Sequence, residues 1–213
     1  MTNLPILYSF VRCPYAMRAR MALIEANMNC ILREVNLKNK PSHMLEISPK
    51  GTVPVLCFTD NSILEESLDI VHHALKLSDE EKQQQKLIAK IINSNDTEFV
   101  NLLRPYKYPD RYPELSALSC RQEIENRFLD KYEKMLEGKL FLLGIKKSLL
   151  DIAILPFIRQ LSIVDSEWFF NSKYKNTISW LKIFTESDAF SNIVMAKHKT
   201  WVANSTPVYL LTE

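Results

Sequence analysis

Glycine is scarce in this sequence, with only Gly51, Gly138 and Gly144 among 213 residues. Loops that cradle phosphate groups need several glycines close together, so a glycine-rich nucleotide loop is excluded. Scarce glycine also favours a mostly helical chain, because glycine is unfavourable inside helices. With 46% hydrophobic and 24% charged residues, the chain is long enough for one large domain or two small ones.

Long apolar runs and an excess of one charge sign are also lacking. No run of about 18 apolar residues occurs, and the first residues lack a charged segment followed by an apolar core. The 27 basic and 25 acidic residues are interspersed and leave a net charge of +2. We therefore expect a cytoplasmic protein with no membrane and no nucleic-acid partner.

The cysteines form no cluster. Cys13, Cys30, Cys57 and Cys120 lie far apart, without a C-x-x-C or His-x-x-x-His pattern. Neither a disulfide framework nor a zinc site is expected, and no metal is implied. A thiol enzyme is still allowed.

The segment around Cys13 has a pattern of its own. Ile6-Leu7-Tyr8 is typical of a buried strand, and from the proline after Cys13 onward apolar residues recur at helical spacing. Cys13 is therefore expected at a helix N-terminus, where unpaired N–H groups, the helix dipole and the charges of Arg12 and Arg18 stabilise a thiolate. We predict a pKa lowered from about 8.5 to between roughly 3.5 and 7.5. From this segment alone, a nucleophilic thiolate and a small residue buried behind a turn both remain open.

The first third of the chain predicts a mixed sheet. Residues 5–77 are expected to run strand, helix, strand, short helix, strand, strand, helix. This order is thioredoxin-like topology in about the length that this fold needs. The strand at Thr52–Phe58 carries Pro54 near its start, where a plain edge-strand proline and a cis peptide bond are both compatible with the sequence.

The remainder of the chain predicts helices. Composition shifts at Ser78–Glu81, which has the pattern of a helix capping box. We expect a thioredoxin-like domain over 1–77, a linker and helix start over 78–86, and an all-helical domain over 87–213. Prolines at positions 105, 109 and 113 predict a non-helical connection over Tyr106–Glu114. The expected fold class is thus an α/β thioredoxin-like N-terminal domain plus an all-α C-terminal domain.

This arrangement resembles the cytosolic glutathione transferase superfamily over essentially the whole chain. Four segments carry the resemblance: Arg12-Cys13-Pro14-Tyr15, Asn36–Pro41, Thr52–Leu56 and Glu66-Ser67. Their order and spacing are similar to those of the omega class, whose nucleophile is a cysteine. The capping pattern at Ser148–Asp151 also looks like the family's hallmark in its helical domain.

Two-domain glutaredoxins are similar as well, since they share Cys-Pro-Tyr and a segment like the one that follows Glu66. Ala16, however, stands where a dithiol enzyme has its second cysteine. The resemblance therefore favours chemistry with a single cysteine.

The resemblance implies glutathione as co-substrate and a homodimer. Val53 would offer its backbone N–H and C=O to the cysteinyl part of glutathione, like an added strand. Glu66 would pair with the γ-glutamyl amine, Ser67 would hold its carboxylate, and Lys40 would meet the glycyl carboxylate. The implied glutathione-binding residues are Phe10, Pro14, Tyr15, Lys40, Thr52, Val53, Pro54, Glu66 and Ser67. Read without the resemblance, Lys40 is an exposed loop lysine, and Glu66 and Ser67 simply cap a helix.

The implied activity is glutathione-dependent thiol transfer in detoxification or redox chemistry. The Cys13 thiolate would attack a mixed disulfide or a small electrophile and be left as a glutathione mixed disulfide, which a second glutathione resolves. Reduction of dehydroascorbate or removal of glutathione from proteins would fit this chemistry.

Two alternatives remain. Tyr8 stands close to where tyrosine-type transferases keep their catalytic hydroxyl, so it could assist conjugation of glutathione to apolar electrophiles. Some bacterial proteins of this fold, of the stringent-starvation type, bind RNA polymerase and do not turn over glutathione. Retention of Cys13, Lys40 and Glu66-Ser67 argues against that second alternative.

Overall fold

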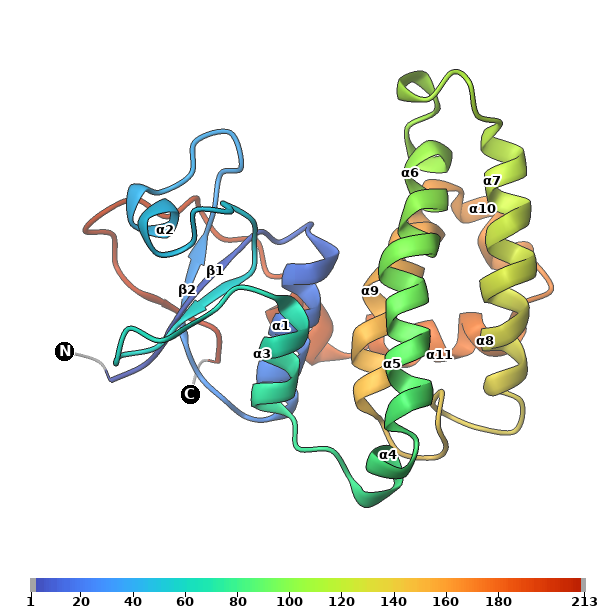
Figure 1. Cartoon of the computed structure of the whole chain (residues 1–213), viewed down its shortest axis with the longest axis horizontal. Helices are drawn as coiled ribbons and strands as arrows, with labels where there is room; N and C mark the ends of the chain where they lie inside the picture. The colour runs from blue at the N-terminus through green and yellow to red at the C-terminus, as the bar shows by residue number, and fades with distance from the viewer. Residues whose placement is uncertain (1–2, 212–213) are drawn as a thin grey trace. The chain divides into compact units, whose positions relative to one another are not determined.

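The structure is a computed structural model that describes residues 3–211 (Figure 1). It divides into two compact units. The first, called here the sheet unit, takes the chain up to Lys76 together with the chain from Glu186 onward. The second, the helical unit, is Leu77–Thr185. A mixed sheet in one unit and helices in the other confirm the predicted fold class.

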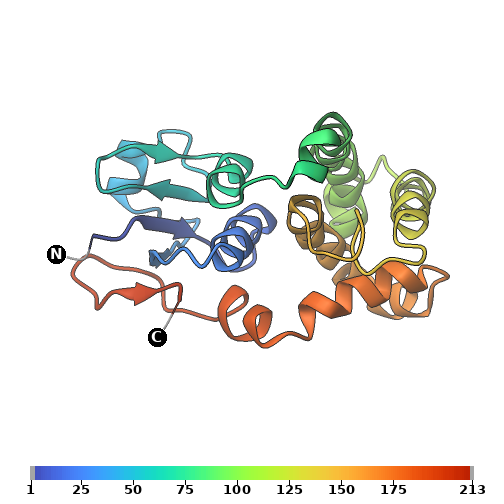
Figure 2. The same ribbon diagram turned by 90° about the horizontal axis from the view of Figure 1, so that it is seen from below.

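The sheet unit is built on a five-stranded sheet in the order β4-β3-β1-β2-β5. The strands are β1 (Ile6–Ser9), β2 (Ile31–Glu34), β3 (Val55–Cys57), β4 (Ile63–Leu64) and β5 (Val208–Tyr209). β1 and β2 are parallel, because a helix connects them, and the other neighbours are antiparallel. Figure 2 shows the short β5 at one edge of this sheet.

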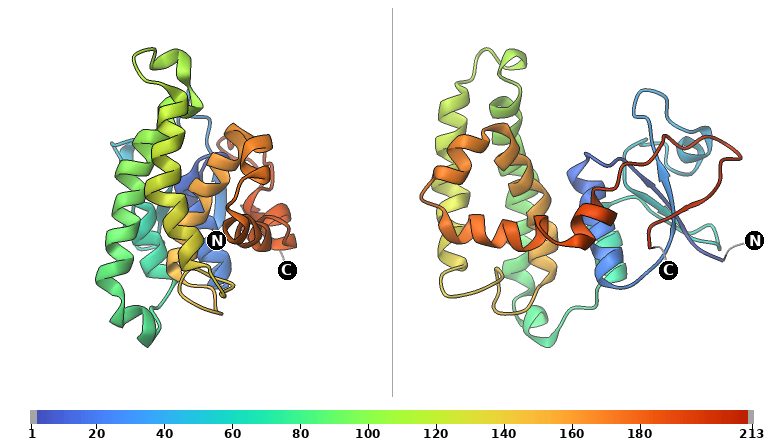
Figure 3. Two further views of the ribbon diagram at one scale, coloured as in Figure 1. Left: turned by 90° about the vertical axis from the view of Figure 1, so that its right-hand side faces the viewer. Right: turned by 180° about the vertical axis from the view of Figure 1, so that it is seen from behind.

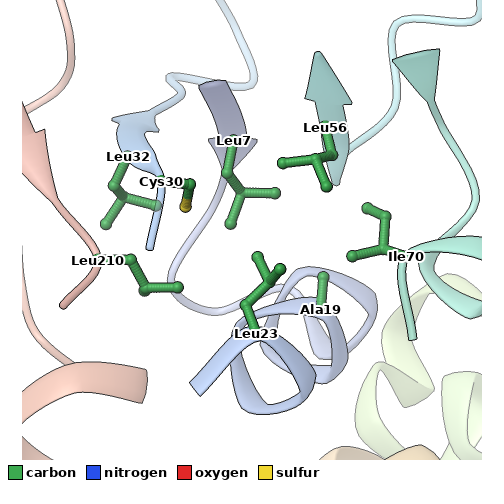
Figure 4. Close-up of a cluster of buried hydrophobic side chains, with 8 residues drawn as sticks. All are labelled: Leu7, Ala19, Leu23, Cys30, Leu32, Leu56, Ile70 and Leu210. Carbon is green, nitrogen blue, oxygen red and sulfur yellow. The ribbon is translucent and has the colours of Figure 1, made fainter. Parts of the chain in front are cut away.

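Helices α1 (Pro14–Glu25) and α3 (Ser67–Ala74) lie side by side against the sheet. Their contact with the strands forms a hydrophobic core, shown in Figure 4. Its buried members are Leu7, Ala19, Leu23, Cys30, Leu32, Leu56, Ile70 and Leu210. Side chains alternate across a strand, so Tyr8 belongs to a second cluster. That cluster includes Met44 of α2 (Ser42–Ile47), and Cys13 packs against it.

The predicted all-helical domain over 87–213 is wrong at its C-terminal end. Residues from Glu186 onward belong to the sheet unit. They form the π-helical turn η4 (Phe190–Val194) and then β5, which pairs with β2. Leu210 is 3% exposed in the sheet core, so burial of this side chain favours the strand. The first two and last two residues of the predicted ranges lie outside the described residues.

All of the named elements in the helical unit are helices. They are α4 (Asp79–Gln83), α5 (Gln85–Ser94), η1 (Asn95–Phe99), α6 (Val100–Lys107), η2 (Pro109–Arg111), α7 (Ala117–Ile124), η3 (Glu125–Leu129), α8 (Asp130–Met135), α9 (Leu149–Val164), α10 (Ser166–Asn171) and α11 (Lys175–Thr185). Figure 3 shows α5 to α6 and α7 to α8 as two antiparallel rods. Each rod contains a π-helical turn, η1 or η3. The rods meet where the rings of Phe99 and Phe128 contact edge to face, with their ring centres 5.3 Å apart.

Both predicted capping boxes are present. Ser78 and Glu81 exchange side-chain and backbone hydrogen bonds at the start of α4, and Ser148 and Asp151 do the same at α9. The connection predicted over Tyr106–Glu114 begins later, because α6 continues through Pro105, and it is not wholly non-helical, since it contains the short 3-10 helix η2. A proline near the end of a helix removes only one hydrogen bond there, so α6 continues to Lys107.

Candidate functional site

Cys13 lies at the N-cap of α1, with Pro14 in the first helical position, as predicted. The turn before it is closed by the Cys13 N–H, which donates to the Phe10 carbonyl at 2.9 Å. The thiol is partly exposed. Its sulfur lies 3.6 Å from the carbonyl oxygen of Val53 and donates a hydrogen bond to it. The structure thus brings Cys13 and Val53 together.

The electrostatics at Cys13 differ from the prediction. Burial raises the pKa of the Cys13 thiol, while the N–H groups of Ala16 and Tyr15 and the charges of Arg20 and Arg18 act to lower it. Desolvation outweighs the helix N-terminus, so the predicted lowered pKa is wrong. The thiolate is the minor form near neutral pH.

The loop before β3 supplies the next part of the site. The Val53–Pro54 peptide bond is cis, and both residues are buried, whereas Thr52 is exposed. Gly51 has a φ of +62°, a left-handed conformation that glycine adopts without strain. Lys40 is half-buried. Its Nζ lies over this turn, 3.5 Å from the position that a Cβ at Gly51 would occupy. Lys40 therefore lies beside Gly51, the residue that precedes Thr52.

Glu66 and Ser67 stand at the start of α3, each beside a positive charge. Glu66 forms an ion pair with Lys50. The Ser67 hydroxyl, which is 4% exposed, accepts a hydrogen bond from the Arg18 guanidinium at 3.2 Å. Arg18 is fully buried on α1, so it links the helix that carries Cys13 to the start of α3.

Phe10 and Tyr15 flank the cysteine on either side. Both rings are half-buried, and so is Pro14. The guanidinium of Arg12 lies 5.3 Å from the Phe10 ring centre, and that of Arg18 lies 5.6 Å from the Tyr15 ring centre. All of the sequence-predicted site residues therefore lie in the sheet unit.

Comparisons with known proteins point to one family. Residues 7–82 match the family model for the N-terminal domain of glutathione S-transferase. The chain is 29% identical over 168 residues to glutathione S-transferase omega-1 of Mus musculus, with 75% of this chain and 68% of that protein covered. It is 28% identical over 173 residues to glutathione S-transferase omega-1 of Rattus norvegicus, with the same shares covered, 75% and 68%. Residues 7–82 therefore resemble the N-terminal domain of a glutathione S-transferase, and three quarters of the chain is similar to omega-class relatives.

Solved glutathione transferases share the fold at low identity. The tau-class enzyme of mango, Mangifera indica, superposes with a TM-score of 0.76 at 22% identity, covering 92% of this chain and 94% of that chain. Glutathione transferase Omega 3C of Trametes versicolor gives 0.72 at 19% identity, covering 93% and 91%.

In this glutathione transferase-like chain, Tyr8 is fully buried. Its hydroxyl lies 2.7 Å from Nδ1 of His43 and accepts a hydrogen bond from Arg33 at 2.6 Å. Burial raises the pKa of Tyr8, although Arg33 acts to lower it. Tyr8 is thus occupied by protein partners, which does not favour the alternative catalytic role.

Two buried arginines on α1 matter more than the sequence suggested. Arg18 was expected only as a nearby charge, and Arg20 was not expected at all. Arg20 donates to the carbonyls of Val11 and Val194, both at 2.9 Å, and to the Ser9 hydroxyl. Burial lowers its pKa to about 10. A charged residue within the otherwise apolar run Ala19–Leu23 was the available signal.

The described residues contain neither a metal-binding group nor a membrane-spanning helix. Within residues 3–211, no group of three or more His, Cys, Asp or Glu side chains is arranged to hold a metal ion. No helix in that range is long and apolar enough to cross a bilayer.

Proposed function

We propose that this chain is a glutathione-dependent thiol transferase of the omega type, with Cys13 as its nucleophile. The observation that carries the proposal is the position of the Cys13 sulfur, partly exposed at the start of α1 and 3.6 Å from the Val53 carbonyl. A peptide thiol whose cysteinyl backbone pairs with Val53 is brought to the same point as the Cys13 sulfur.

The reaction has two exchange steps. The Cys13 thiolate attacks the glutathione sulfur of a mixed disulfide, forming the Cys13–glutathione disulfide and releasing the other thiol, which takes up a proton. A second glutathione, as thiolate, then attacks the glutathione sulfur of that adduct. Oxidised glutathione leaves and the Cys13 thiolate is restored.

A second glutathione is required because the protein offers no resolving thiol in the turn. Ala16 occupies that position and is buried. Cys30 is fully buried, and burial raises its pKa to about 12, so it is not a source of thiolate. The monothiol route follows from these two residues.

The remaining residues hold glutathione in this proposal. Lys40 pairs with the glycyl carboxylate, Val53 with the cysteinyl backbone, Glu66 with the glutamyl amine and Ser67 with the glutamyl carboxylate. The walls around the thiol are formed by Phe10, Pro14, Tyr15, Thr52 and Pro54. A homodimer and a cytoplasmic location are part of the proposal on family grounds, and light scattering of the purified protein tests the first.

The test is the intact mass of the protein after exposure to oxidised glutathione, followed by peptide mapping and by reduced glutathione. We expect one adduct, on Cys13, that reduced glutathione removes. The Cys13→Ser variant should show neither the adduct nor transferase activity, with Cys120→Ser as the matched control. Absence of an adduct, or an adduct on Cys120 alone, contradicts the proposal, and failure to bind immobilised glutathione would favour a non-catalytic binding protein.

A further inference from the structure

Lys50 lies in the turn between α2 and β3, and no role in glutathione binding was expected for it. The Gly51 N–H donates to the Ser48 carbonyl at 2.9 Å, which closes this turn and presents Lys50 toward the start of α3. There its ammonium group forms the ion pair with Glu66. The side chains remain 40% and 63% exposed, so both charges are open to a ligand.

Stability does not explain this pair. Exposed ion pairs contribute little to folding because water and salt screen them and two flexible side chains must be ordered. A cation and an anion held side by side do, however, match a ligand that carries both charges on one carbon. The γ-glutamyl end of glutathione is such a group, with an α-amine and an α-carboxylate.

The neighbouring Ser67 favours the same arrangement. Its oxygen accepts a hydrogen bond from Arg18 at 3.2 Å, so its own proton is directed to another acceptor. A ligand carboxylate at this place accepts a hydrogen bond from the Ser67 hydroxyl and also pairs with the Lys50 ammonium group, which already lies at Glu66. The α-amine of the same ligand then pairs with the Glu66 carboxylate.

We infer that Lys50 is a specificity-determining residue that binds the α-carboxylate of the γ-glutamyl group while Glu66 binds the α-amine. The inference rests on the proposed function, since it concerns the same glutathione site. It predicts selection for thiols that carry a complete amino-acid end. Ligands lacking either charge leave one member of the pair unmatched.

The test compares three ligands by calorimetry under reducing conditions. They are glutathione, an analogue without the carboxylate (4-aminobutyryl-Cys-Gly) and an analogue without the amine (glutaryl-Cys-Gly). We expect Lys50→Met to weaken glutathione binding roughly tenfold and to leave the affinity for the carboxylate-free analogue unchanged. Glu66→Gln should weaken glutathione but not the amine-free analogue.

Lys82→Met is the matched control, because Lys82 forms an exposed ion pair with Asp79 at 2.9 Å in the helical unit. Unchanged or tighter glutathione binding by Lys50→Met would overturn the inference, since Lys50 would then only compete for Glu66. An equal loss for glutathione and the carboxylate-free analogue would overturn it too. If the wild-type protein binds no glutathione, the proposed function itself fails, whereas a wild-type site that is indifferent to Lys50 refutes only this inference.

Discussion

The thiol of Cys13 and the carbonyl oxygen of Val53 lie 3.6 Å apart, although 40 positions separate the two residues. The contact joins the N-terminus of α1 to the loop that leads into β3. The thiol is partly exposed, and the carbonyl accepts its hydrogen bond. In the proposed function, this proximity places the Cys13 nucleophile beside the backbone that pairs with glutathione.

The reactivity of Cys13 should increase with pH across the alkaline range. Only the thiolate reacts with alkylating agents, and burial raises the pKa of Cys13, so the thiolate fraction is small near pH 7 and grows as pH rises. We expect the rate of iodoacetamide labelling at Cys13 to keep rising above pH 8.5, about the ordinary pKa of a cysteine thiol. Mass spectrometry of the Cys13 peptide measures this rate.

Free glutathione in the same buffers is the reference for an exposed thiol, and Cys13→Ser reports labelling of the other cysteines. A labelling rate that is already constant between pH 6 and 8 would mean a low pKa. That result would restore the expectation from the helix N-terminus and contradict the effect of burial.

Arg18 should support both the thiol and the Ser67 contact. Arg18→Met removes a buried positive charge that lowers the pKa of Cys13, and it removes the donor to the Ser67 hydroxyl. We expect the pH profile of Cys13 labelling to move to higher pH and glutathione affinity to fall by about tenfold. The free energy of unfolding should fall by roughly 1–3 kcal/mol, as for other buried polar contacts.

Arg18→Lys separates these effects. Lysine keeps the positive charge but lacks the planar guanidinium, so the labelling profile should return toward that of the wild type while glutathione binding stays weak. Equal labelling profiles for the methionine and lysine variants would show that the charge of Arg18 does not act on Cys13.

Local patterns in the sequence predicted the architecture and the placement of Cys13. Helix periodicity, Pro14 and the capping patterns depend on neighbouring residues, so they are visible in one sequence. The sequence is compatible with either a cis bond or a plain edge-strand proline at Val53–Pro54, and the structure contains the cis bond. The roles of the site residues remain predictions, although the structure gathers them in the sheet unit.

The errors concern long-range contacts and burial. Val208 pairs with Leu32, and no local signal reports a partner so distant in sequence. The pKa of Cys13 depends on how much protein covers the sulfur, which a helix start alone does not determine. No pattern in the sequence singles out Lys50, and its place beside Glu66 depends on the fold.

Gly51 should be more sensitive to alanine than Gly138. Both have left-handed backbones, with φ of +62° and +68°, so each substitution costs about 1–2 kcal/mol of strain. At Gly51 the new Cβ would also lie 3.1 Å from Leu45, beside Lys40, whereas nothing lies within 4 Å at Gly138. Glutathione affinity should therefore fall in Gly51→Ala, by roughly threefold, and stay unchanged in Gly138→Ala. Calorimetry of both variants checks this, and equal affinities would remove Lys40 and its loop from the site.

The C-terminal segment should stabilise the sheet unit through Leu210, which directly follows β5. Its N–H donates to the Cys30 carbonyl at 3.0 Å, and its side chain is buried in the core shown in Figure 4. Leu210→Ala leaves a cavity there, so we expect a loss of about 2–5 kcal/mol in the free energy of unfolding by urea. Labelling of Cys30 in the folded protein should also accelerate, because that thiol lies in the same core. Val202→Ala, at a side chain that is 62% exposed, should change stability by no more than about 0.5 kcal/mol. If both variants lose equally little stability, Leu210 does not contribute to the stability of the core, and the prediction is wrong.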